Sequence, residues 1–227
     1  MLSIEKTVLP SPEQWQIIIE GMRNPMNSWS KSDSYKTCIE DQETLQTADF
    51  EFFIGDADRD LMMRLANGGS VHAKYRRMIP VWANINAPIY WWKEFDTYKV
   101  GTVVNSCSTM HKIHDKELTL DNFSTEHLVK GAVEELTGLI KCINKYRAKF
   151  LETGNNVYWQ QMIQLLPSSF NQKRTVMINY EVLAGIYKHR RNHKLDEWHD
   201  FCEWVEGLPY FKEIVIQEEK DGEECLS

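Results

Sequence analysis

The chain has 227 residues, of which 42% are hydrophobic and 26% are charged, so it can bury a substantial core. Its formal net charge of −7 argues against a general nucleic-acid-binding surface, which would be basic. The five cysteines are odd in number, widely spaced and never in a C-x-x-C pair, which argues against a disulfide framework or a zinc ribbon.

We expect neither a signal peptide at residues 1–15 nor a membrane span in this chain. Residues 1–15 lack the apolar stretch of a signal peptide, and no apolar stretch of the sequence is long enough to span a membrane. We therefore expect a cytoplasmic protein. Residues 1–12 are predicted to form an extended arm, and the acidic residues 217–227 are predicted to be a disordered tail.

The first half of the chain is predicted to alternate helices with short strands. Ser11 followed by Pro12 is a strong helix start, and this helix is expected to end near residues 24–25. Residues 27–36 are predicted to be a polar loop. Residues 50–54 are expected to form a short strand, although a helix stays open, and residues 58–66 form a helix closed by Gly68.

The second half is predicted to be mostly helical. After an ambiguous stretch at 71–77, residues 78–85 are strand-like, and Pro88 begins a short aromatic helix that is followed by a polar loop. Ser124 is expected to open the longest helix, which ends at Gly154. A helix over 159–166, a strand at 176–178 and helices over 180–187 and 195–205 complete the chain. Because no linker divides these elements, residues 1–216 are expected to form one domain.

Residues 90–111 crowd aromatic, acidic, basic and small polar side chains into one segment. Aromatic faces stack on flat rings, and Asn, Ser and Thr side chains hydrogen-bond the edges of a ligand, so the segment suits a nucleotide or ring-cofactor pocket. A buried aromatic helix followed by a polar loop would give the same composition. Both interpretations stay open on the residues alone.

The order of motifs around this segment resembles the flavin-dependent thymidylate synthase family, ThyX. The stretch Gly68-Gly69-Ser70-Val71-His72 stands where that family has a Gly/His/Ser-rich turn. Asn105 and Ser108 keep an Asn-x-x-Ser spacing, and Leu166-Pro167 leads to Asn179 and a helix that ends in basic residues. The resemblance spans about residues 55–205 and implies an α+β domain with a mixed β-sheet covered by helices.

The family's signature is degenerate in this chain. Its Arg-His-Arg triplet falls on Tyr98-Lys99-Val100, its Ser falls on Val103, and Glu181 stands where an Arg is expected. The resemblance implies a homotetramer with pockets between subunits and a pyrimidine-nucleotide ligand such as dUMP. It also implies reductive one-carbon transfer with FAD, more weakly bound here, and a folate carbon donor. The alternative is a catalytically silent nucleotide-binding or regulatory protein on the same scaffold.

The candidate site residues fall into three groups. Those with catalytic side chains are Glu94, Tyr98 and Lys99; those expected to bind the nucleotide are Arg174, Arg190, Arg191, Asn105, Ser106 and Ser108; those expected to contact the cofactor are Trp91, Trp92, His72 and Asn179. Arginine suits phosphate because its planar guanidinium stays charged and bonds in a fork. The competing interpretation of Arg190 and Arg191 is a solvated basic helix end.

No metal is expected. His189 and His193 are four residues apart, but no second cluster of ligands accompanies them, and His111 and His114 raise the same question in a loop. Residues 56–60 mimic the start of a calcium loop but lack its Gly and closing Glu, so a helix cap is the better interpretation. Cys107 could be a nucleophile, but no base can be assigned to it.

Overall fold

The computed structural model describes residues 2–39 and 49–216. Their contacts gather into two compact units. The first comprises residues 2–7, 82–177 and 195–197, and the second comprises residues 8–39, 49–81, 178–194 and 198–216. The expectation of a single domain over 1–216 stays a prediction, and the predicted acidic tail lies outside the described residues. No described helix is long and apolar enough to cross a membrane.

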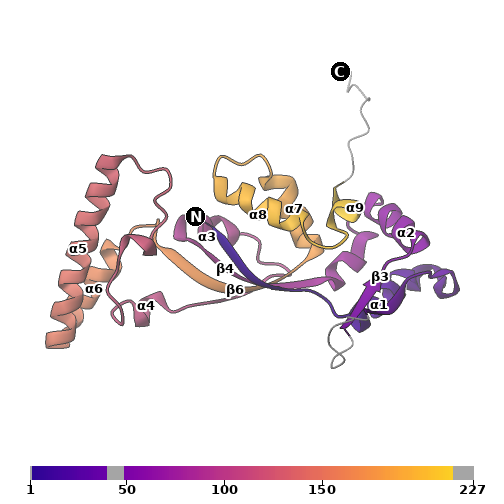
Figure 1. The fold of residues 1–227 in the computed structure, drawn as a ribbon, viewed down its shortest axis with the longest axis horizontal. Coiled ribbons are helices and arrows are strands. Elements are labelled where there is room, and N and C mark those ends of the chain that lie inside the picture. The colour runs from indigo at the N-terminus through magenta and orange to yellow at the C-terminus, as the bar shows by residue number, and fades with distance from the viewer. Residues whose placement is uncertain (1, 40–48, 217–227) are drawn as a thin grey trace, which may run out of the picture. The chain divides into compact units, whose positions relative to one another are not determined.

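A four-stranded sheet has the order β1-β4-β6-β5, formed by β1 (Ser3–Val8), β4 (Pro80–Pro88), β5 (Val103–Ser106) and β6 (Asn171–Asn179) (Figure 1). In β4, Val81, Ala83, Ile85 and Ala87 are buried while the residues between them are half-buried, which is the period of two of a sheet covered on one face. The extended N-terminal arm forms β1, and the predicted strand at 176–178 is the end of a longer strand.

The predicted polar loop after Gly101 is wrong over residues 103–106. These residues form β5, which pairs antiparallel with β6 so that Val103 lies opposite Met177 and Ser106 lies opposite Arg174. Val103 and Val104 favour extended backbone, and the polar residues are tolerated because β5 is the edge strand of the sheet.

The first unit also contains α3 (Ile89–Phe95), α4 (Thr109–Lys112), a short 3-10 turn at Leu120–Asn122, α5 (Lys130–Thr153) and α6 (Asn156–Leu165). α5 and α6 lie side by side (Figure 1) and share a core that includes Ile140, Ile143 and Met162. The turn between them uses Gly154 at φ 65°, in the left-handed region that favours glycine.

The predicted opening of the longest helix at Ser124 is wrong by six residues, because α5 begins at Lys130. Ser124 is buried and donates from its hydroxyl to Asn171 Oδ1 at 2.9 Å, while its backbone N–H donates to Ser169 O at 2.9 Å. These long-range bonds hold residues 123–124 beside the start of β6, and they outweigh the local capping preference of serine.

The second unit contains α1 (Pro12–Arg23), 3-10 turns at Asn24–Met26, Trp29–Lys31 and Ala73–Met78, the hairpin of β2 (Tyr35–Ile39) and β3 (Asp49–Phe53), α2 (Asp56–Asn67), α7 (Tyr180–Arg190), nearly all of α8 (Asp196–Glu206), and α9 (Phe211–Val215).

The predicted start of α1 is confirmed: Ser11 and Gln14 form a capping box. Its buried face carries Trp15, Ile18, Ile19 and Met22, as the helical spacing predicts.

A buried ion pair joins α1 to α2 in this unit. Arg23 is 3% exposed and Asp58 is fully buried, and the Arg23 Nε donates to Asp58 Oδ1. The second carboxylate oxygen of Asp58 accepts from the hydroxyls of Ser32 and Ser34, each at 2.7 Å, and from the backbone N–H groups of Asp33 and Ser34, each at 3.1 Å. One carboxylate therefore fixes the loop that leads into β2.

Candidate functional site

The aromatic helix α3 is built into the core of the first unit. Trp91 and Trp92 are both 0% exposed and meet edge to face with ring centroids 4.9 Å apart, while Trp91 stacks on Phe95 at 5.1 Å. The indole N–H of Trp92 donates to Gln172 O at 2.9 Å. The structure thus places these two predicted cofactor-binding residues as a buried aromatic cluster, and their contact with a ring cofactor stays a prediction.

Arg174 lies against this cluster and forms a wall of it. Its guanidinium carbon is 4.2 Å from the centroid of the Trp92 ring, a cation–π geometry. Its Nη1 donates to Asp96 Oδ1 at 2.8 Å, and its Nε donates to Gln172 Oε1 at 2.9 Å. These three contacts engage much of the guanidinium, so its predicted role in holding a phosphate would require some of them to be exchanged.

A cavity of about 340 Å³ opens at the end of α3, and we call it the α3 cavity. Its lining residues are Phe95, Asp96, Tyr98, Lys99, Thr102 and Val104. Two of the three predicted catalytic residues therefore line one cavity: Tyr98 is half-buried and Lys99 is exposed. Glu94, the third, is half-buried on α3 but does not line the cavity. The chemistry available here is ring stacking by Tyr98 and one positive charge from Lys99.

Thr102 adds a feature that sequence reasoning missed. Its hydroxyl oxygen is buried in the cavity wall and has no hydrogen-bond partner among the described residues. A buried polar atom without a partner is costly, and such atoms are often paired by a ligand or a water. The signal in the sequence was weak, because Thr102 reads as one more small polar residue after Gly101.

The polar residues that follow the cavity are split between strand and cap. Asn105 and Ser106 are exposed on β5, opposite Thr175 and Arg174 respectively. Ser108 accepts from the backbone N–H of His111 at 3.1 Å and caps α4. Pairing with β6 thus brings Ser106 next to Arg174, whereas Ser108 has a structural role that accounts for its position.

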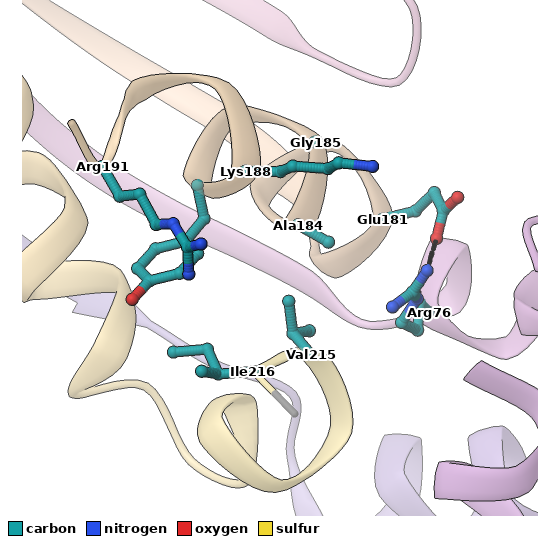
Figure 2. A pocket seen from close by; sticks show the side chains of 9 residues that line it. Arg76, Glu181, Ala184, Gly185, Lys188, Arg191, Val215 and Ile216 are labelled. Atoms are coloured by element: carbon teal, nitrogen blue, oxygen red, sulfur yellow. Dashed lines mark hydrogen bonds and ion pairs between the residues drawn. The ribbon is translucent and has the colours of Figure 1, made fainter. Parts of the chain in front are cut away.

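The second unit holds a separate basic pocket, which Figure 2 shows between α7 and α9. We call it the α7 pocket; its volume is about 400 Å³, and its lining residues are Arg76, Glu181, Ala184, Gly185, Tyr187, Lys188, Arg191, Val215 and Ile216. In Figure 2, Lys188 and Arg191 project from α7 while Val215 and Ile216 close the opposite side. The lining thus contains three cationic side chains and one carboxylate.

Arg76 and Glu181 form the fixed pair of this pocket. The Arg76 Nε and Nη2 lie 2.8 and 2.7 Å from Glu181 Oε2, and both side chains are mostly buried. The carboxylate of Glu181 is therefore compensated by Arg76 within the unit. Lys188 is exposed and adds a further positive charge to the lining. Arg76 was missed from the sequence because it lies 105 residues from its partner.

Tyr187 supports the other end of the pocket. The Arg191 guanidinium lies 6.0 Å from the Tyr187 ring centroid, and the Tyr187 hydroxyl donates to Glu206 Oε1 at 2.7 Å. Burial, reinforced by this hydrogen bond, raises the pKa of Tyr187 to about 12. Tyr187 thus stays neutral at physiological pH and positions the arginine rather than exchanging a proton with a ligand.

The remaining predicted residues of the second unit have local roles. Arg190 packs over Trp198, with its guanidinium carbon 4.9 Å from the ring centroid. The side chain of Asn179 accepts from the backbone N–H of Val182 at 3.1 Å and caps the start of α7. His72 is exposed at the start of the 3-10 turn that contains Arg76. No group of three possible metal ligands gathers among residues 2–39 and 49–216.

No protein-family model matches the sequence, and no curated protein matches it. Solved structures do match: thymidylate synthase X (ThyX) from Helicobacter pylori with FAD and dUMP has a TM-score of 0.61 and 15% identity, over 95% of this chain and 96% of that chain. The fold of the present chain is therefore ThyX-like. A second structure of the same enzyme, also complexed with FAD and dUMP, gives a TM-score of 0.59, again at 15% identity over 95% of this chain.

This likeness covers nearly the whole of both chains, so it confirms the predicted α+β, ThyX-like fold. At 15% identity it shows the fold alone. The roles of individual residues must therefore be argued from their own contacts.

Proposed function

We propose that this chain binds a pyrimidine nucleotide, with dUMP as the first candidate, and that the α7 pocket holds its phosphate. The observation that carries the proposal is that three cationic side chains and one carboxylate line this pocket of a ThyX-like fold. Arg191 supplies a guanidinium fork, Lys188 supplies a mobile ammonium, and Arg76 is held in place by Glu181. The related structures that contain dUMP support the choice of nucleotide.

The arginines differ in what they can offer a phosphate. Arg174 is engaged by Asp96, Gln172 and Trp92, and Arg190 covers the ring of Trp198. Arg191 lines the pocket and packs against the Tyr187 ring. Because it lines the pocket, we assign the principal phosphate contact to Arg191. Arg190, Arg174, Asn105, Ser106 and Ser108 remain proposed contacts of the nucleotide.

The finer proposal is an enzyme that performs reductive one-carbon transfer at the uracil ring, with Glu94, Tyr98 and Lys99 as the reacting or polarising groups. Tyr98 can stack on a ring, Lys99 can stabilise a developing negative charge, and the Thr102 hydroxyl can bond a ring edge. The carbon would come from a folate, and a reduced flavin would supply the hydride. His72, Asn179, Trp91 and Trp92 remain the proposed contacts of a cofactor.

The α3 cavity does not fit a whole FAD. Its volume of about 340 Å³ is at the lower end of the range for ligand pockets, and its lining contains one cationic side chain, Lys99, which is little positive charge for a diphosphate. The Thr102 hydroxyl suits a single ring with a hydrogen-bonding edge. We therefore expect flavin to bind weakly.

The alternative is a catalytically silent nucleotide-binding or regulatory protein. It is favoured by the exposed position of Lys99 and by the hydrogen bond that already engages Arg174 with Asp96. The two possibilities share the phosphate site and differ only in turnover. An assay for formation of the methylated nucleotide, with reduced flavin and a folate donor supplied, separates them.

The phosphate site is tested by calorimetry with dUMP on Arg191→Ala. Loss of a charge-assisted contact worth about 1.5–3 kcal/mol should weaken binding about tenfold or more. The matched control is Lys194→Ala, which removes a nearby exposed positive charge that does not line the pocket. Equal affinities of wild type and Arg191→Ala, or an equal loss in both variants, would argue against a specific phosphate site.

We further propose a homotetramer, in which α7 pockets and α3 cavities of different copies would complete one another. The high aromatic content suits a large interface. Light scattering should give a mass of about four chains. A strictly monomeric protein would remove this part of the proposal.

A further inference from the structure

The second unit has another pocket, formed by α1 and the loop that leads into β2, which we call the α1 pocket. Its volume is about 460 Å³, within the range of sites for small ligands. The residues that matter for its chemistry are Gln16, Glu20, Trp29, Ser32, Tyr35 and Lys36. None of them takes part in the proposed nucleotide site, so the two sites are independent.

Two aromatic side chains flank this pocket and remain accessible. Trp29 is 49% exposed and Tyr35 is 59% exposed. The Trp29 indole N–H donates to Asn24 Oδ1 at 2.8 Å, and the Tyr35 ring stacks on Phe53 with centroids 5.6 Å apart. Both rings are therefore held in position while an aromatic surface stays open to solvent. Fixed, exposed aromatic surfaces beside a cavity suit a ligand with an apolar ring face.

The polar floor of the pocket is pre-organised and rich in hydrogen-bond acceptors. The Ser32 hydroxyl donates to the buried Asp58, which leaves its oxygen lone pairs for a ligand. The Gln16 side-chain N–H donates to Glu20 Oε1 at 3.3 Å, so the Gln16 carbonyl and the second Glu20 oxygen also accept. A ligand for this floor must carry several donors, and the rigid loop reduces the ordering cost of binding it.

The charges of the pocket disfavour an anion. Lys36 is paired with Glu13, so its charge is already compensated, and Glu20 adds a carboxylate to the lining. A phosphate placed here would face Glu20, and the lining offers only Lys36, already paired with Glu13, to balance it. The favoured ligand is therefore neutral, has one apolar face and bears several hydroxyl groups.

We propose that the α1 pocket binds a neutral saccharide ring. The apolar C–H face of the ring packs against Trp29 or Tyr35, and its hydroxyl groups donate to Glu20, Gln16 and Ser32. The site has the chemistry of a recognition site for sugars, and no reaction is assigned to it.

The experiment is saturation-transfer NMR on the full chain with four disaccharides: maltose, cellobiose, lactose and chitobiose. At least one should show transfer to the protons of one ring face and bind with a dissociation constant below about 10 mM. Trp29→Ala and Glu20→Ala should each weaken that binding about tenfold, while Tyr158→Ala, which alters a half-buried aromatic residue on α6, should leave it unchanged.

Three outcomes would overturn the proposal. The first is the absence of transfer to all four disaccharides. The second is equal binding by wild type and by both pocket variants, since Glu20→Ala alters an exposed side chain and should leave the fold intact. The third is displacement of the bound sugar by dUMP at concentrations that saturate the protein, which would make this the nucleotide site instead.

Discussion

Replacing Asp58 with Asn should destabilise the second unit more than any conservative surface change. The Asp58 carboxylate is fully buried. Five groups donate hydrogen bonds to it: the Arg23 guanidinium, two serine hydroxyls and two backbone N–H groups. An Asn amide keeps the shape but presents an NH₂ group to some of these donors. It also leaves the charge of Arg23, which is 3% exposed, without its counterion.

The expected loss is large relative to the stability of a typical domain. Removing one partner of a buried ion pair costs about 3–5 kcal/mol, against a total free energy of unfolding of about 5–15 kcal/mol. The Arg23 Nη2 already has no partner among the described residues, so little else can compensate that charge. With a urea dependence of about 1–3 kcal/mol/M, the unfolding midpoint should fall by about 1 M or more.

The assay is urea unfolding followed by tryptophan fluorescence, with Asp60→Asn as the matched control. Asp60 lies on the same helix and pairs with Arg64, but both side chains are about two-thirds exposed. Its loss should change stability by less than about 1 kcal/mol. If Asp58→Asn and Asp60→Asn unfold at the same urea concentration as the wild type, the buried network does not stabilise this unit as described.

The same carboxylate should make stability depend on pH. Burial opposes its ionisation, but hydrogen bonds from Ser32, Ser34 and Arg23 outweigh burial and lower its pKa. A carboxylate with a lowered pKa stabilises the folded state at pH values above its unfolded pKa of about 3.9, and that contribution is lost as the pH falls toward its folded pKa. The difference in unfolding free energy between wild type and Asp58→Asn should therefore be largest near neutral pH and shrink in acid.

Three further outcomes follow from the structure. Arg174→Ala removes a cation–π contact and a hydrogen bond to Asp96, so it should lower the free energy of unfolding, measured by thermal unfolding, by about 1–3 kcal/mol. Its control is Lys173→Ala: Lys173 is next to Arg174 on β6 but belongs to an exposed ion pair, so its loss should have little effect. At pH 8, a thiol reagent followed by mass spectrometry should label the exposed Cys107 before Cys202, whose pKa burial raises to about 11; equal rates would contradict this. The purified protein should be pale or colourless, and a stoichiometric flavin spectrum would refute the expected weak flavin binding.

The sequence predicted well those elements whose signals are local. Ser11, Pro12 and the spacing of Trp15, Ile18, Ile19 and Met22 define α1 completely, because a capping box and an apolar face depend only on residues within the helix. Gly154 ends α5 for the same reason. The order of motifs along the chain was enough to indicate the fold even though the signature residues are replaced.

Features that depend on distant residues could not be predicted. β5 exists because β6, about 70 residues later, pairs with it, and Ser124 is drawn away from α5 by Ser169 and Asn171. The composition of α3 was compatible with either a ring-binding surface or a core. Only the structure shows that Trp91 and Trp92 are buried and that Arg174 covers Trp92.

The most direct test of nucleotide binding compares dUMP with deoxyuridine by calorimetry on the unmodified chain. The two ligands share base and sugar and differ only in the phosphate that the α7 pocket is proposed to hold. We predict saturable binding of dUMP at least about tenfold tighter than that of deoxyuridine, because one or more charge-assisted bonds are lost without the phosphate. Equal affinity for the two ligands, or no binding of dUMP, would contradict the account.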